Sequence, residues 1–180
     1  TEKAVAIRSP QEAQKLGIST VYQEITLCPN LSVAENMYIG RGSSMVQNWK
    51  KMNADADKIL QSLDIPAKAT QQLASCSLAV QQMVAIARAV DMECKVLILD
   101  EPTSSLDEQE VAKLFMLMRD LKKKGVGIIF VTHFLDQVYE VCDKITVLRD
   151  GQLVGEYEIE NLPRVQLVSK MLGKDLDDMA

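Results

Sequence analysis

Two short apolar runs, separated by a segment of helical periodicity, constrain the fold more than any other feature of this sequence. The runs are Val96–Leu99 and Gly127–Val131, and the segment Glu108–Lys124 between them is predicted to be a helix. Continuous apolar strands joined by helices are typical of a mainly parallel sheet that helices cover on both faces. The sequence therefore predicts an α/β fold.

The rest of the chain divides into a helical block and further α/β elements. In residues 24–92 polar loops alternate with helical patterns, so this block is predicted to be a helical insertion. Residues 1–23 and 93–180 are then the α/β core, in which Asp150-Gly151 predicts a hairpin turn. The other predicted helices are Pro10–Leu16, Ser32–Tyr38, Lys50–Leu63, Ser77–Val90, Leu135–Val141 and Arg164–Leu172, and the other strands are Ile18–Tyr22, Lys144–Leu148 and Leu153–Tyr157.

Composition excludes several classes of function. The 180 residues carry 25 acidic and 20 basic side chains, a net charge of −5, and only 4% aromatics, which argues against binding to nucleic acid. The four cysteines form no CxxC pair and His133 is the single histidine, so a zinc site is not expected. Four unpaired thiols indicate a reducing compartment. No apolar run is long enough to cross a bilayer, so any membrane role is expected to act through a partner.

The strongest chemical signal is a pair of acids at the end of an apolar strand. Asp100 and Glu101 follow Val96–Leu99 directly, which places Asp100 at the carboxyl edge of the sheet, where α/β proteins bind ligands. A carboxylate held there suits Mg²⁺, and the adjacent Glu101 could accept a proton from water or orient it. These residues alone are equally compatible with two surface acids before the turn at Pro102.

Three more polar residues stand at the ends of predicted elements. Asp107 begins the helix after the acid pair, where it also suits an N-cap with Glu110 three residues later. His133 ends the next apolar strand and could hydrogen-bond a phosphate oxygen. Gln23 ends the first strand, at the point where the helical block begins.

In their order and spacing these motifs resemble the ATP-binding cassette (ABC) family. The acid pair resembles its Walker B motif, residues 104–107 its D-loop, Gln23 its Q-loop and His133 its switch histidine. Residues 76–82, Cys-Ser-Leu-Ala-Val-Gln-Gln, occupy the position of the family's signature, Leu-Ser-Gly-Gly-Gln. Leu78 and Ala79 replace both glycines, which puts close backbone approach to a phosphate in doubt.

The chain is most similar to the ATPase subunits of bacterial carbohydrate importers of the ribose, galactose and galactofuranose type. That resemblance implies a P-loop-NTPase-like, mainly parallel sheet with a helical insertion, and ATP and Mg²⁺ as cofactors. The implied partners are transmembrane permease subunits, a second nucleotide-binding cassette and, indirectly, a periplasmic sugar-binding protein. It also implies a cytoplasmic position, peripheral on the inner face of the membrane. The site residues it implies are Glu101 and His133 for catalysis, Asp100 and Gln23 for Mg²⁺, and Gln23, Ser77, Ala79, Gln81 and Asp107 for the nucleotide.

One motif of the family does not occur: the sequence contains no GxxxxGK[ST], the P-loop that cradles phosphates. We therefore expect a truncated first cassette that lacks its P-loop segment and hydrolyses negligible ATP alone. Two alternatives remain open at this point. One is a non-hydrolytic docking module for the membrane subunits, and the other is a non-transport ABC-type ATPase of DNA repair or chromosome structure. The latter needs a long coiled-coil insertion, for which residues 24–92 are too short and irregular.

Overall fold

The computed structural model describes residues 3–23, 26–41 and 48–173, which form two compact units. The first unit extends to Val131 and the second begins at Thr132. The predicted division into residues 24–92 and a discontinuous α/β core stays a prediction.

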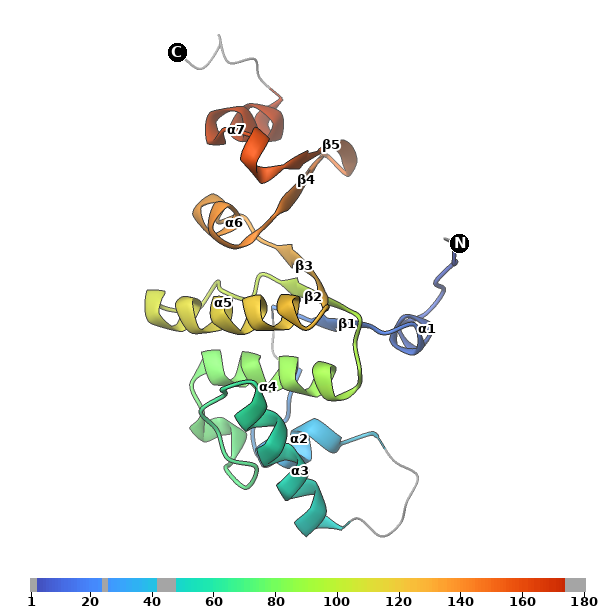
Figure 1. Cartoon of the computed structure of the whole chain (residues 1–180), viewed down its shortest axis with the longest axis vertical. Helices are drawn as coiled ribbons and strands as arrows, with labels where there is room; N and C mark the ends of the chain where they lie inside the picture. The colour runs from blue at the N-terminus through green and yellow to red at the C-terminus, as the bar shows by residue number, and fades with distance from the viewer. Residues whose placement is uncertain (1–2, 24–25, 42–47, 174–180) are drawn as a thin grey trace. The chain divides into compact units, whose positions relative to one another are not determined.

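The first unit contains a three-stranded parallel sheet, as the sequence predicts. Its strands are β1 (Ile18–Val21), β2 (Val96–Asp100) and β3 (Gly127–Val131), in the order β1-β2-β3. Figure 1 shows them side by side in the middle of the ribbon. Because all three strands run the same way, their carboxyl ends meet at one edge of the sheet.

Five helices and one short 3-10 turn complete this unit. Helix α4 (Leu78–Asp91) packs on β1 and on α5 (Glu108–Lys123), while α2 (Val33–Tyr38) and α3 (Trp49–Ser62) contact each other and α4. Figure 1 shows α2 and α3 beyond α4, on the side away from the strands. The remaining elements are α1 (Pro10–Lys15), beside β1, and the 3-10 turn η1 (Leu73–Ser75).

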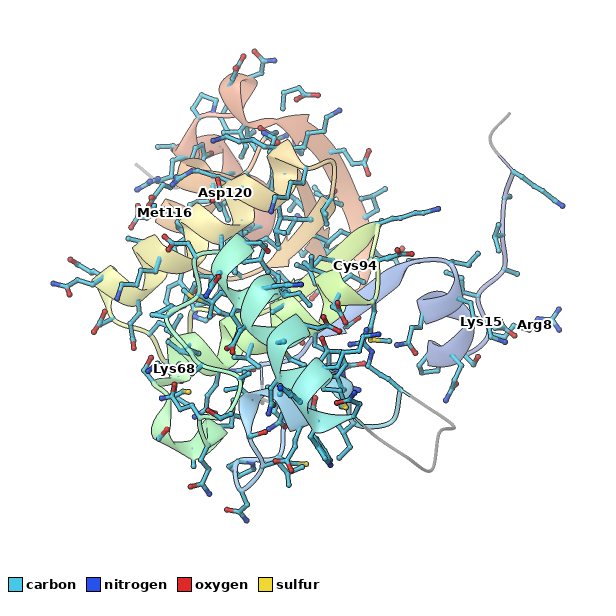
Figure 2. All side chains as sticks on the ribbon, turned by 60° about the horizontal axis from the view of Figure 1, so that its bottom comes forward. Arg8, Lys15, Lys68, Cys94, Met116 and Asp120 are labelled. Carbon is cyan, nitrogen blue, oxygen red and sulfur yellow. The ribbon has the colours of Figure 1, made fainter. Side chains whose placement is uncertain are left out.

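Helix α5 buries one face of the sheet. Buried Phe115 of α5 meets Phe130 of β3 edge to face, with ring centroids 6.0 Å apart, whereas the outward side of α5 carries exposed Met116 (Figure 2). Side chains alternate along a strand, so Ile129 and Val131 point to the opposite face, where they are 52% and 45% exposed. The expectation of helical cover on both faces stays a prediction.

The second unit is built on an antiparallel hairpin of β4 (Lys144–Arg149) and β5 (Gln152–Glu158). Asp150 and Gly151 join the strands with φ of 51° and 73°, the left-handed conformation that a two-residue hairpin turn requires, which confirms the predicted turn. Helices α6 (Leu135–Val141) and α7 (Arg164–Leu172) and the 3-10 turn η2 (Ile159–Asn161) complete the unit. Its core consists of buried Val147, Leu162 and Leu167.

Reciprocal capping fixes the starts of two helices in the first unit. The Ser32 hydroxyl accepts from the Glu35 N–H at 3.1 Å, while the Glu35 carboxylate accepts from the Ser32 N–H at 2.6 Å. Asp107 and Glu110 form the same box at the start of α5, with distances of 2.8 and 3.1 Å, as the spacing of these acids predicts. No helix among the described residues is long and apolar enough to cross a membrane.

Candidate functional site

The acid pair lies at the carboxyl end of the central strand. Asp100 is the last residue of β2 and is half-buried. Glu101 follows with φ of 48°, a left-handed conformation that costs free energy in any residue with a side chain. Its N–H donates to the Val131 carbonyl of β3 at 2.9 Å, so the hydrogen bond just beyond the sheet fixes this conformation. The strained residue therefore coincides with the one that the sequence marks as catalytic.

Gln23 emerges at the same edge of the sheet. It stands two residues beyond the end of β1, and the register pairs Val21 with Leu99, the residue before Asp100. Gln23 is exposed, whereas the strand that precedes it, β1, is hydrogen-bonded to β2 in the sheet. Gln23 and Asp100 thus present oxygen ligands from adjacent parallel strands.

A pocket of about 300 Å³ joins this edge to two other predicted motifs. It is bounded by the end of β1, the first turns of α4 and the loop between β2 and α5. The residues that line it are Gln23, Leu78, Gln81, Gln82, Pro102, Ser104, Ser105 and Leu106. The first unit thereby brings two of the predicted nucleotide-binding residues, Gln23 and Gln81, to one cavity.

The predicted signature residues are held by local contacts at the start of α4. Ser77 is the N-cap of this helix, and its hydroxyl accepts from the Val80 N–H at 3.3 Å. Gln81 donates from Nε2 to the Cys76 carbonyl at 3.1 Å, and Ala79 is buried. Leu78, in place of a glycine, leaves its side chain 49% exposed at the helix N-terminus. The side chain of Ala79 therefore does not reach solvent, and only its backbone could serve an anion.

The two remaining predicted site residues lie outside the pocket lining. Asp107 is exposed and caps α5, so its carboxylate already accepts the Glu110 N–H. His133 belongs to the second unit, is exposed, and lies with its ring centroid 4.2 Å from that of Phe134 at a tilt of 35°. Both residues have the exposure that contact with a ligand or a second protein requires.

The oxygen donors at the sheet edge fit a magnesium ion. Mg²⁺ in nucleotide sites is usually held by one or two carboxylates, with water and phosphate oxygens completing the octahedron. Asp100 supplies a carboxylate and Gln23 an amide oxygen from adjacent strands. Among the described residues no group of three or more His, Cys, Asp and Glu side chains could hold a metal.

Sequence reasoning missed Gln82. Its neighbours Ala79, Met83 and Ile86 form the buried face of α4, and Gln82 lies on that face at 5% exposure. A polar residue within a helix's apolar stripe was the available signal.

It also missed a groove of about 480 Å³ between α1, the free edge of β1 and α4. Arg88 is the only charged residue among the described residues that line it, and it donates from Nη2 to the Ile39 carbonyl at 3.1 Å. Burial, with nearby Arg41, lowers the pKa of Arg88, because each disfavours the positive charge. Tyr22, Thr26 and Leu27, on either side of residues 24–25, line the same groove.

Residues 3–104 match the family model described as ABC transporter. The chain belongs to the ABC transporter family. It is 51% identical over 180 residues to the galactofuranose transporter ATP-binding protein YtfR of Escherichia coli (strain K12), covering 99% of this chain and 36% of the relative. It is 47% identical over 173 residues to the fructose import ATP-binding protein FruK of Bifidobacterium longum (strain NCC 2705), covering 94% of this chain and 34% of that relative. The chain thus spans about a third of the length of these curated relatives.

Solved ABC structures share this fold. The ATP-binding cassette MJ1267 in its ADP conformation superposes with a TM-score of 0.77 at 23% identity, over 93% of this chain and 72% of that one. At that identity the likeness concerns the fold alone. The structure of cbiO1 from Clostridium perfringens, part of the ABC transporter complex cbiONQ, gives a TM-score of 0.70 at 29% identity, over 84% of this chain and 62% of that one.

Proposed function

We propose that this ABC transporter family chain acts as the first cassette of an ATP-binding subunit that powers sugar uptake through an importer. The observation that carries the proposal is the convergence of Asp100, Glu101 and Gln23 at the carboxyl edge of one parallel sheet. The identities of 51% and 47% to ATP-binding proteins of a galactofuranose transporter and a fructose importer support a sugar as the transported substrate.

In this proposal Asp100 and Gln23 hold Mg²⁺, which when bound neutralises charge on the nucleotide phosphates. Glu101 orients the attacking water and accepts its proton, and the hydrogen bond from its N–H to the Val131 carbonyl keeps it in place. His133 donates a hydrogen bond to a phosphate oxygen, which its exposure allows. Preorganised groups of this kind stabilise developing charge without reorganising during the reaction.

The remaining predicted residues serve an interface with a second cassette. Ser77 and the N–H groups at the start of α4, that of Ala79 included, approach the phosphates held by the facing cassette, because a helix N-terminus attracts anions. Gln81 supports this turn through its hydrogen bond to the Cys76 carbonyl. Asp107, at the exposed start of α5, couples the two sites.

Transmembrane permease subunits are the proposed membrane partners, with a periplasmic sugar-binding protein acting on their far side. The chain is then cytoplasmic and peripheral on the inner face of the membrane. The groove beside β1 supports docking of permease segments near Gln23, because Tyr22, Thr26 and Leu27 line it on both sides of residues 24–25. Movement of a docked segment could thereby reach the sheet edge that carries the acids.

Calorimetry of Mg-ATP binding tests this proposal on two versions of the protein, this chain and a version extended upstream through a P-loop segment. We expect binding only by the extended version, because backbone N–H groups of a P-loop supply most contacts to the phosphates. Glu101→Gln in the extended version should retain binding and lose turnover. Hydrolysis by this chain alone that disappears with Glu101→Gln would overturn the assignment.

A non-hydrolytic docking module is the second candidate function. The exposed Leu78 at the start of α4 favours it, since this side chain stands where a glycine would let phosphate approach. If neither version binds Mg-ATP while this chain still binds membranes that contain the permease subunits, the docking module is the correct reading.

A further inference from the structure

A buried acceptor without a donor marks the pocket between β1, α4 and the loop that follows β2. Gln82 is 5% exposed, and its Oε1 has no hydrogen-bond partner among the described residues. Buried polar side-chain atoms are normally paired, and an unpaired one in a native structure calls for an explanation. Turning the amide by 180° would exchange its oxygen and nitrogen, so the unpaired atom would then be a donor that needs an acceptor.

The same pocket contains a group that can meet either requirement. Gln23 lines it from the end of β1, and its carboxamide carries both a donor and an acceptor. Within the described residues the side chain of Gln23 takes part in no hydrogen bond, and it is exposed, so few contacts restrain its rotamer. Gln81 also lines the pocket, but its Nε2 already donates a hydrogen bond to the Cys76 carbonyl.

We propose that the carboxamides of Gln82 and Gln23 pair across this pocket, and that Gln82 is thereby a positioning residue for Gln23. The Nε2–H of Gln23 donates to Oε1 of Gln82, which satisfies the buried acceptor and holds Gln23 against the first turns of α4. Gln82 is well suited to this role because buried Met83 and Ile86, beside it on the same face, anchor its helix.

The pairing competes with the other task proposed for Gln23, and this consequence rests on the proposed function. A Gln23 amide held against α4 has to leave Gln82 before its oxygen reaches Mg²⁺ at the sheet edge. A nucleotide that needs Gln23 at the edge therefore binds less tightly by the fraction of molecules in which Gln23 is paired. Gln82 would thus set the nucleotide affinity without touching the nucleotide.

A double-mutant cycle in this chain tests the pairing without any nucleotide. The variants are Gln23→Ala, Gln82→Met and the double variant, measured by urea unfolding, with exposed Gln61→Met on α3 as a matched control. A neutral side-chain hydrogen bond predicts a coupling of about two- to twelvefold in the unfolding equilibrium constant. Additive effects of the two substitutions would overturn the pairing, and Gln61→Met should show no coupling to Gln23→Ala.

A second experiment tests the consequence in the version extended through a P-loop segment. Gln82→Met should tighten Mg-ATP binding by up to about tenfold and leave binding of Mg-free ATP unchanged, because only the magnesium complex needs Gln23. In a Gln23→Ala background Gln82→Met should have no effect. Equal shifts with and without Mg²⁺ would overturn the competition. Coupling in the unfolding cycle together with no ATP binding would instead show that the pairing is right and the proposed function wrong.

Discussion

Two buried amides in the first unit differ in how completely they are satisfied. Asn36 of α2 is 1% exposed; its Oδ1 accepts the Cys28 N–H at 2.7 Å, and its Nδ2 donates to the carbonyls of Cys28 and Ser32, each at 2.9 Å. Gln82 of α4 is 5% exposed and its Oε1 has no partner among the described residues. The two side chains have the same chemistry and nearly the same burial.

The difference shows which amide serves the fold and which is available to a ligand or a moving group. Asn36 ties the segment after residues 24–25 to its own helix, so this region is fixed by hydrogen bonds made within a few residues of chain. Gln82 faces a pocket shared with Gln23 and the loop at residues 102–106, so its partner has to come from a different part of the unit. The buried amide that lacks a hydrogen-bond partner thus lies at the candidate site.

The largest effect is expected for Asn36→Leu. The substitution leaves the Cys28 N–H without its acceptor and removes one of the two donors from each of the Cys28 and Ser32 carbonyls, so we expect a loss of about 2–3 kcal/mol in the free energy of unfolding. Urea unfolding of the chain measures it, with exposed Asn30→Ala as the control. A loss as small as that of the control would show that the network around Asn36 contributes little, and the contrast with Gln82 would disappear.

A smaller loss is expected where the same helix begins. Ser32→Ala removes one acceptor of the capping box that precedes α2, and such a change costs about 1 kcal/mol. Because Ser32 also supplies a carbonyl to Asn36, the effects of Ser32→Ala and Asn36→Leu should be less than additive when combined. Strict additivity in the unfolding free energies would mean that the cap and the Asn36 network act separately.

Gln82→Met is expected to change the unfolding free energy by no more than about 1 kcal/mol in either direction. The substitution keeps the length of the side chain and removes only the proposed pairing with Gln23, whose exposed amide can turn to water instead, so little net hydrogen bonding is lost. A loss equal to that of Asn36→Leu would show that Gln82 is satisfied as fully as Asn36 in solution.

The thiols beside the two regions offer a comparison that is measured by reaction rates. Cys28 is exposed, whereas Cys76 is buried and burial raises its pKa, which lowers its thiolate fraction at any pH below that value. We therefore expect Cys28 to react with a maleimide before Cys76, and the Cys76 rate to keep rising with pH into the alkaline range. Measurement needs variants that retain one cysteine each. Equal rates at pH 8 would show that the turn before α4 opens readily.

Local sequence patterns predicted most elements of secondary structure to within a residue or two. The helix predicted at Leu135–Val141 and the strand at Gly127–Val131 have the predicted bounds, and the Asp150-Gly151 turn joins β4 to β5. These features depend on neighbouring residues, through periodicity, caps and turn conformation. Which element packs on a face of the sheet could not be predicted in this way, because contacts such as that of Phe115 of α5 with Phe130 of β3 join residues of different elements.

The candidate site likewise contains one part that the sequence predicts and one that it does not. The acid pair at Asp100 and Glu101 follows from strand pattern alone, because an apolar strand in a parallel sheet has to end at the ligand edge. The meeting of Gln23 with α4 in one pocket joins residues nearly sixty positions apart, and no local pattern encodes it.

The secondary-structure elements, their parallel arrangement, the family and the acids at the strand end could all be predicted from the sequence, because short-range periodicity or fixed motifs encode each of them. Three features became visible in the folded chain: the left-handed conformation of Glu101 with its hydrogen bond to the Val131 carbonyl, the complete hydrogen bonding of Asn36, and the unpaired Oε1 of Gln82. These outcomes depend on whether a donor from a distant segment reaches a buried acceptor, and packing alone settles that distance.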